Sequence, residues 1–304
     1  MALVNHTHES FATTTTGLRY DIPPMILFDR AKRLGIWNPA DIDFSRDAED
    51  WQRLNPEQQS YLKSVCSRFI SGEEAVTLDL LPLMKAVSES GHLEEAIFLT
   101  TFLWEEAKHI DFFTRALSAF NVDAGELEVY HSPYYRQLFY ETLPERMSVL
   151  YHDPSPANLV RASATYNLMI EGVLAETGYF IFFQIMDENN ILPGTRQGIR
   201  NLQMDESRHI AYGVFLLSRL VAEDDSLFSI IEEVLAESQE YQRLSTQDNI
   251  KRFGQIPFKL DYEQVGAFSK SQYERRLARI RKARGKSLEE IYRSGKALLE
   301  ESVN

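Results

Sequence analysis

The sequence predicts an all-α fold, a four-helix bundle core with additional helices, and three observations carry this prediction. No segment alternates apolar and polar residues in the way that a half-buried strand does. Four long segments repeat apolar residues three and four positions apart, which is the pattern of one helix face. These segments also begin and end at recognisable helix signals.

The first long helix is expected over residues 55–88 and the second over residues 93–120. Asn55 can cap the first helix, Pro56 suits its first turn, and Gly91 separates it from the second. A shorter helix in "LFYETLPERM" is expected to end at Pro144. The further expected helices are 153–189 and 195–222, which complete the bundle, and then 227–244, 271–284 and 288–301.

We expect a single domain over residues 1–304, with its core over about 55–222 and accessory helices over 223–304. Residues 1–20 are polar and rich in threonine, so we expect them to be poorly ordered. The proline-containing segment after them predicts irregular structure with a short helix, and residues 250–268 are interrupted by glycine and proline. Ser287 and Glu290 form a capping box for the last helix.

The composition narrows the classes of partner and compartment. With 45 acidic and 32 basic residues the net charge is −13, which disfavours nucleic acid as a partner. The single cysteine, Cys66, cannot form an intrachain disulfide. The first 20 residues lack the features of a secretory signal, and no segment reads as a transmembrane helix, so we expect a cytoplasmic protein.

Glutamates interrupt the apolar faces of the first two long helices. At 100° per residue Glu73 lies on an apolar stripe, whereas its neighbour Glu74 lies on a more polar face and is expected to be solvated. In "FLWEEAKHID", Glu106 and His109 share an apolar stripe, and Glu105 falls away from it. This Glu-x-x-His motif alone is weak evidence, because such pairs are common on solvated helices.

The second half of the bundle repeats this pattern. Glu171 lies on the apolar face of the third long helix, and "MDESRHIAYG" places Glu206 and His209 on the apolar face of the fourth. The spacing from Glu73 to Glu106 is 33 residues, and the spacing from Glu171 to Glu206 is 35. The sequence therefore contains a pseudo-repeat of a helical hairpin.

Four carboxylates buried in one bundle require compensation, since a buried bare carboxylate is costly. Two metal cations would supply it, and oxygen ligands with one imidazole per ion favour iron or manganese. This ligand pattern is that of ferritin-like dinuclear bundles. The sequence therefore predicts a two-metal site formed by Glu73, Glu106, His109, Glu171, Glu206 and His209.

Several stretches also resemble the ribonucleotide reductase small-subunit superfamily, and within it the ligand-binding oxidases with a manganese–iron centre. They are "WNPADIDF", "SGEEAVTLD", "EEAKHID", "YNLMIEGVLAETGYF" and "MDESRHIAYG". The resemblance implies that Glu106 bridges the metals. It also implies manganese with Glu73 and His109, and iron with Glu171, Glu206 and His209; two irons remain an alternative.

The same resemblance implies an ether cross-link between Val76 and Tyr166, although an ideal helix does not place Tyr166 on the face of Glu171. Tyr179 is a secondary redox candidate. Phe113 stands where a radical-storing reductase subunit usually has a tyrosine. Asp205 is expected to hydrogen-bond a ligand histidine, and Trp37 is interpreted as a structural anchor.

The implied activity is O2 activation for the two-electron oxidation of a hydrophobic substrate. The resemblance implies an apolar tunnel, a long-chain fatty-acid-like ligand at the metals, and a homodimer; the electron donor stays unknown. The basic stretch 270–286 is interpreted as a solvated helix, with an anionic partner as the alternative.

Two other functions remain open at this point. The first is a ribonucleotide reductase small subunit with a manganese–iron centre, for which Tyr292 could take part in a radical path. The second is a ferritin-like metal storage or binding protein, which would load many more than two ions per chain.

Overall fold

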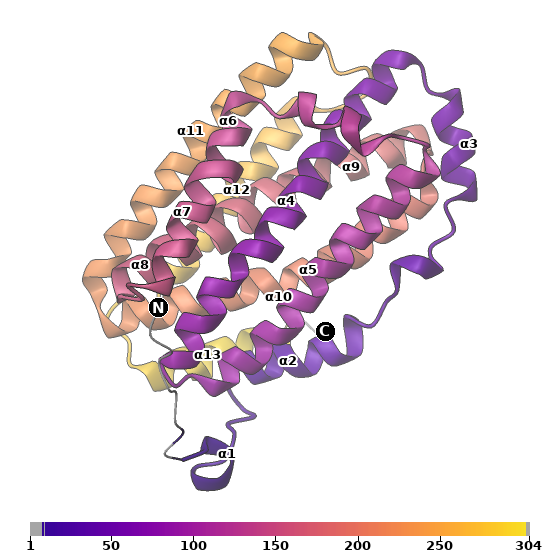
Figure 1. Cartoon of the computed structure of the whole chain (residues 1–304). Coiled ribbons are helices and arrows are strands. Elements are labelled where there is room, and N and C mark those ends of the chain that lie inside the picture. Colours follow the sequence, from indigo (N-terminus) through magenta and orange to yellow (C-terminus); the bar gives the residue numbers. More distant parts are fainter. Residues whose placement is uncertain (1–7, 9, 302–304) are drawn as a thin grey trace, which may run out of the picture.

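The computed structural model describes residues 8 and 10–301, and within them it contains helices and no strand (Figure 1). Four long helical segments form the centre of the molecule, which confirms the all-α, ferritin-like prediction. These segments are α4 (Pro56–Glu89), α5 (Leu93–Ala119), the continuous run Pro156–Asn189 and α10 (Pro193–Glu223).

The signals at the first hairpin act as predicted. The Asn55 side chain accepts a hydrogen bond from the Gln58 backbone at 2.9 Å, and the Gln58 side chain accepts one from the Asn55 backbone at 3.1 Å. Gly91 connects α4 to α5 with φ of 82°, a left-handed conformation that glycine adopts without a steric penalty. As a result α4 and α5 pack side by side along their length (Figure 1).

The peripheral helices differ from the prediction in three places. Pro144 does not end a helix: it occupies the first turn of α7 (Leu143–Ser148), where its missing N–H is harmless. The helix expected at 227–244 continues to residue 253 as α11 (Phe228–Phe253). Asp261 caps α12 (Tyr262–Arg281) by accepting from the Gln264 backbone at 3.0 Å, so this helix begins nine residues before the expected start at 271.

The remaining elements cover the ends and sides of the bundle. An N-terminal helix, α2 (Pro23–Leu34), packs on α5 and α10, and the last helix, α13 (Leu288–Glu301), begins at the predicted Ser287–Glu290 capping box. The others are α1 (Ala12–Thr15), η1 (Pro39–Asp41), α3 (Ser45–Arg53), η2 (Ala124–Glu126), η3 (Glu128–Tyr130), α6 (Pro133–Arg136), η4 (Gln137–Thr142), η5 (Val149–Tyr151) and η7 (Asp225–Leu227). The disorder expected for residues 1–20 falls partly on residues 1–7 and 9, which lie outside the described residues.

The third long segment is not one regular α-helix. It consists of α8 (Pro156–Ser163), a π-helix η6 (Ala164–Ala175) and α9 (Glu176–Asn189). Hydrogen bonds in a π-helix join residues five apart, so residues i and i+5 lie on adjacent turns of one face. Tyr166 and Glu171 are five apart, and the π-helix therefore removes the geometric objection raised by an ideal α-helix.

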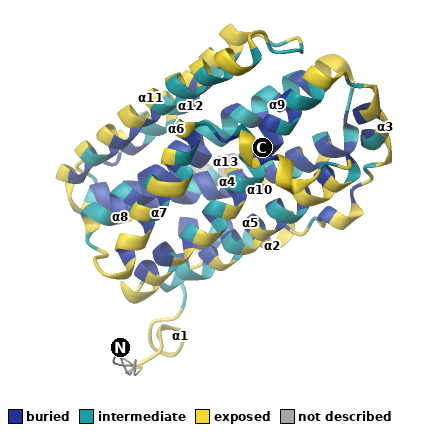
Figure 2. Ribbon diagram, turned by 45° about the horizontal axis from the view of Figure 1, so that its top comes forward, coloured by how far each residue is buried: buried dark blue, intermediate teal, exposed yellow. Residues whose placement is uncertain are grey.

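Buried residues fill the inner faces of the central helices (Figure 2), and they form two apolar clusters, one on each side of the predicted ligands along the chain. One cluster includes Val76, Phe102 and Tyr166, and the other includes Cys66 and Phe113. Each ligand-bearing helix passes through both clusters, and its carboxylate lies at the boundary. The four glutamates Glu73, Glu106, Glu171 and Glu206 form a layer across the bundle, here called the acidic layer. Apolar side chains enclose this layer on both sides.

Two stretches have a composition that could indicate a membrane or an anionic partner. Pro156–Asn189 has the length and apolar composition of a membrane-crossing helix, although the sequence analysis expected none; 56% of its most apolar window is buried inside the bundle, as in a core helix. In the basic stretch 270–286, Arg281 pairs with Glu232 at 3.4 Å and Arg284 with Asp225 at 2.5 Å. These pairs favour a solvated helix that balances acidic neighbours.

Candidate metal centre

The structure brings the six predicted ligand residues together inside the bundle. Donor atoms of Glu73, Glu106, His109 and Glu206 lie within 4.8 Å of one another, and so do those of Glu106, Glu171, Glu206 and His209. All six residues are buried. Glu106 and Glu206 belong to both groups, so each could contribute to two neighbouring ions.

The two histidines have the same orientation toward the acidic layer. Nδ1 of His109 lies 3.3 Å from Glu73 and 3.6 Å from Glu106, and Nδ1 of His209 lies 2.9 Å from Glu106. Both imidazoles therefore direct Nδ1 inward and Nε2 outward. Each can bind an ion through one nitrogen while the other is held by the surrounding protein.

Five buried atoms of this layer make no hydrogen bond: both carboxylate oxygens of Glu106, one oxygen each of Glu171 and Glu206, and Nδ1 of His209. Buried polar atoms are normally paired, because an unpaired one costs about 1 to 3 kcal/mol. Here the unpaired atoms face one another. Carboxylate oxygens and imidazole nitrogen are donors that iron and manganese accept, so the residues fit a pair of such ions.

Burial raises the pKa of most of these carboxyl groups, whereas the two imidazoles lower the pKa of Glu106. Burial raises the pKa of Glu73 to about 8, and burial together with the Glu206 charge raises the pKa of Glu171 well above its usual value. Burial opposes ionisation of Glu106 as well, but the two imidazoles outweigh it and lower its pKa to about 2. Burial also opposes the charged imidazoles, yet the facing carboxylates raise the pKa of His109 and His209 well above the usual range.

Metal binding is therefore expected to release protons. The raised pKa values of Glu73, Glu171, Glu206 and both imidazoles favour the protonated forms of these groups in the metal-free site, and bound ions must displace these protons. Raising the pH removes these protons and should strengthen binding; lowering it should weaken binding. Titration of the metal-free chain with Mn²⁺ or Fe²⁺ in weak buffer with a pH indicator measures this release. Release of less than about one proton per chain would contradict the expectation.

The outward nitrogens of the two histidines bind acidic residues that precede the opposite motif. Nε2 of His209 lies 2.9 Å from Glu105, and Nε2 of His109 lies 3.4 Å from Asp205. The expected contact of Asp205 with a ligand histidine is confirmed. Glu105 leaves the stripe of Glu106, as expected, and it is fully buried against the neighbouring helix α10, a contact that the sequence did not predict.

Glu105 and Asp205 belong to an outer layer around the metal-facing residues, and two cationic side chains complete it. Lys108 donates to Asp205 at 2.9 Å, and the Arg208 guanidinium contacts both Asp205 and Glu105, the latter at 2.5 Å. Gly35, at the end of α2, lies so close to Glu105 that a β-carbon there would collide with its carboxylate. A longer repeat in the sequence could have predicted this outer layer. The stretches "EEAKHI" and "DESRHI" have the same order of residue types: an acidic residue, Glu, a small residue, a basic residue, His and Ile.

The charges of both layers can be balanced by two divalent ions. The layers contain six carboxylates, which are the four metal-facing glutamates with Glu105 and Asp205, and two cations, Lys108 and Arg208. Full ionisation leaves four negative charges, which two divalent cations neutralise. Trivalent ions would leave two positive charges, and an additional anionic ligand would then be favoured.

The other predicted residues lie next to this layer. Tyr166, fully buried, donates from its hydroxyl to the Val76 carbonyl oxygen at 3.1 Å. The Tyr179 hydroxyl lies 3.4 Å from both Glu73 and Glu206. Phe113 is buried and stacks on Phe69 with ring centroids 5.5 Å apart, so no phenol is present at that position.

Trp37 and Asn167 hold groups around the site. Trp37 donates from its indole nitrogen to Asp205 at 2.8 Å, which agrees with its interpretation as an anchor. Asn167, which the sequence analysis did not select, donates to Glu171 at 3.0 Å and accepts from Ser163 at 2.9 Å. The sequence could have indicated this contact, because Asn167 precedes Glu171 by four residues on the same helical segment.

A cavity of about 950 Å³ reaches the acidic layer from the side covered by α11 and α12. Near the layer it is lined by Glu73, Glu171, Glu206 and Tyr179, and farther out mainly by apolar residues. The apolar part includes Phe69, Val76, Leu138, Phe139, Ile170, Leu174 and Ile181. This space is large enough for an elongated ligand.

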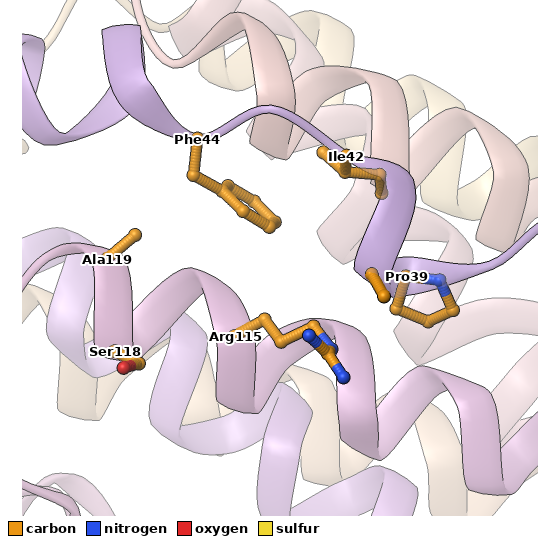
Figure 3. Close-up of a pocket in the computed structure, with 7 residues that line it drawn as sticks. Pro39, Ile42, Phe44, Arg115, Ser118 and Ala119 are labelled. Carbon is orange, nitrogen blue, oxygen red and sulfur yellow. The ribbon is translucent and has the colours of Figure 1, made fainter.

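A second recess, of about 310 Å³, lies between the segment around Ile42 and Phe44 and the end of α5 (Figure 3). Its one charged residue, Arg115, pairs with Asp111 at 3.0 Å. It contains none of the predicted ligands, so the cavity at the acidic layer is the candidate functional site.

Known proteins that are similar to this chain have the same fold, and some of them contain a manganese–iron cofactor. Residues 30–284 match the family model for the ribonucleotide reductase small chain. An R2-like ligand-binding oxidase with aerobically reconstituted Mn/Fe cofactor is 37% identical, with a TM-score of 0.86, over 90% of this chain and 98% of the other. A tyrosine-to-phenylalanine variant of such an oxidase, with anaerobically reconstituted Mn/Fe cofactor, is 38% identical, with a TM-score of 0.85 and the same coverage.

Proposed function

The chain belongs to the ribonucleotide reductase small-chain family, and we propose that it is an O2-activating oxidoreductase with a manganese–iron centre. The single observation that carries this proposal is the buried layer of four carboxylates and two imidazoles, whose unpaired atoms face one another. Solved relatives with Mn/Fe cofactors, aligned over 90% of the chain, support the choice of metals.

In this proposal Glu73 and His109 hold manganese, Glu171, Glu206 and His209 hold iron, and Glu106 bridges them. The presence of Glu106 in both donor groups supports the bridge. When bound, the two ions supply O2 activation and a two-electron oxidation. Tyr179, with its hydroxyl 3.4 Å from two of the carboxylates, is a secondary redox candidate in this proposal.

We further propose an ether cross-link between the Val76 β-carbon and the Tyr166 phenol oxygen. The hydrogen bond from the Tyr166 hydroxyl to the Val76 carbonyl, at 3.1 Å, brings the two residues together and supports this. The reaction removes one hydrogen from Cβ and one from the phenol, and a C–O bond replaces the two bonds that break. O2 accepts the two electrons and two protons.

The ligand in this proposal is a long-chain fatty acid or a similar aliphatic acid. The 950 Å³ cavity, with its apolar walls, suits a hydrocarbon chain. A carboxylate at its inner end would supply negative charge that oxidised ions require. Val76 lines the same cavity, so the oxidation of a bound chain and of Val76 would occur in one place.

The radical-storing alternative is less well supported. Phe113 has no hydroxyl to lose a proton, and Tyr292 belongs to the folded helix α13, where its ring stacks on Phe215 with centroids 6.0 Å apart. The homodimer, the external electron donor and the cytoplasmic location stay predictions.

Reconstitution under air tests the proposal. The metal-free chain, given Mn²⁺ and Fe²⁺, is expected to consume O2 and to lose two hydrogens in mass, localised to peptides that contain Val76 and Tyr166. Tyr166→Phe should abolish the mass loss, whereas the matched variant Tyr179→Phe should retain it. Two bound metals with O2 consumed and no mass loss would remove the cross-link alone; absence of O2 consumption would overturn the oxidase proposal.

A further inference from the structure

The outer half of the cavity has an unusual charge pattern for so acidic a protein. Away from Glu73, Glu171 and Glu206, its lining contains two arginines and no carboxylate among the described residues. The chain as a whole carries a net charge of −13. Uncharged hydrogen-bonding residues from α11 line the same cavity: Gln239, Gln242, Ser245, Thr246, Gln247 and Asn249.

The two arginines differ in their partners. Arg243 is exposed and pairs with Glu240 through contacts of 2.6 and 2.7 Å. Arg68 is half-buried, and its guanidinium donates to the Asn249 side chain at 2.7 Å. Within residues 8 and 10–301 no carboxylate pairs with it directly at 4.0 Å or less, and the Asp248 carboxylate and the Arg252 guanidinium act on it only from farther away.

An arginine in this position is costly without an anion. A half-buried guanidinium loses part of its hydration, and burial lowers the pKa of Arg68. Its planar fork matches carboxylate and phosphate oxygens, which can accept two hydrogen bonds at once. The neutral Asn249 beside it adds a polar contact without neutralising the charge.

Arg68 is also aligned with the rest of the site along α4. Arg68, Gly72 and Val76 are each four residues apart, so they form one stripe of the helix, and all three line the cavity. Arg68 lies about 7.5 Å from Glu73 and about 12 Å from Val76 along the helix axis. An added β-carbon at Gly72 would lie 3.6 Å from Phe139 and 3.8 Å from the Tyr135 hydroxyl, which is ordinary van der Waals contact, so these two rings face the glycine between Arg68 and Val76.

We propose that Arg68 and Asn249 form a second anchor that binds an acidic group, so that the preferred ligand is an aliphatic chain with two acidic groups. One acidic group lies at the metal-facing carboxylates and the other at Arg68, with the apolar wall between them. This inference rests on the proposed function, because it assumes that an aliphatic acid occupies the cavity. It adds the chemical class of that ligand.

Binding of paired acids tests the anchor. The metal-loaded chain is titrated with saturated monocarboxylic acids and α,ω-dicarboxylic acids over a series of matched chain lengths. At the optimal length the diacid is expected to bind about tenfold or more tightly than the monoacid, since a hydrogen bond to a charged group is involved. Arg68→Met should erase this preference while the monoacid affinity changes little.

Arg243→Met is the matched control, because it removes the other cation of the lining, and it should keep the preference for diacids. The same preference in Arg68→Met, or equal binding of both acids at every length by the unchanged chain, would overturn the anchor and leave the proposed function standing. If neither acid binds, the aliphatic ligand of the proposed function fails, and the anchor fails with it.

Discussion

Replacing Glu106 with glutamine is expected to remove both metal ions from the chain and to abolish its O2 consumption. Glu106 belongs to both donor groups, and an amide in its place would lack the negative charge and one of the two oxygen donors. Elemental analysis after reconstitution should fall from about two ions per chain to well below one. The rise in melting temperature on metal addition should disappear as well, since ligand binding is its source.

The same substitution should destabilise the metal-free chain. With its pKa lowered to about 2, Glu106 is ionised between two protonated imidazoles, and glutamine leaves those buried cations without their main counter-charge. Loss of one partner of a buried ion pair costs about 3 to 5 kcal/mol, which denaturant unfolding of the metal-free chain would measure.

Glu74→Gln serves as the control for Glu106→Gln. Glu74 follows Glu73 directly, as predicted it is exposed, and it belongs to neither donor group. Its replacement should leave metal content and O2 consumption unchanged. Two tightly bound ions and normal O2 consumption in Glu106→Gln would show that this residue is not a bridging ligand.

Replacing Glu105 and Asp205 should weaken the two metal positions in a crossed pattern. Glu105 contacts His209, and Asp205 contacts His109, so each acid supports the histidine of the other motif. Loss of such a partner typically lowers metal affinity 10- to 100-fold, because it no longer fixes the imidazole and its basicity. Glu105→Gln should therefore deplete the ion held by His209, and Asp205→Asn the ion held by His109.

The metal ratio after dialysis against a chelator reports this effect. Direct removal of each histidine provides the reference: Glu105→Gln should change the manganese-to-iron ratio in the same direction as His209→Gln, and Asp205→Asn in the same direction as His109→Gln. This comparison holds whichever metal occupies each position. If each acid instead follows the histidine of its own motif, the crossed arrangement is wrong.

The sequence was sufficient for the fold class and for the inner donor set because both depend on periodicity within single helices. Glu73 and Glu74 are adjacent and chemically identical, yet their apolar and polar faces distinguish them, and the structure buries the first and exposes the second. The same argument selected Glu106, His109, Glu171, Glu206 and His209, which the structure brings within reach of one another.

Periodicity was less informative where a residue acts across helices. Glu105 falls outside the stripe of its own helix, and only the packing of α5 against α10 and the end of α2 reveals its contact with His209. The π-helix between Ala164 and Ala175 also differs from the regular helix that the sequence predicts there, because apolar periodicity does not reveal which backbone groups hydrogen-bond to each other. The contact between Tyr166 and Val76 was consequently inferred from resemblance and not from geometry.

The sequence by itself therefore determined an all-α bundle with two Glu-x-x-His helices and two further glutamates on apolar faces, since one residue's position on a helix follows from counting along the chain. Only the tertiary structure decided which acid holds which histidine and that Arg68 faces the cavity with Asn249, and no carboxylate, in direct contact with its guanidinium. The physical reason is that contacts between helices depend on their relative placement, and the chain segments that set this placement are far apart in sequence.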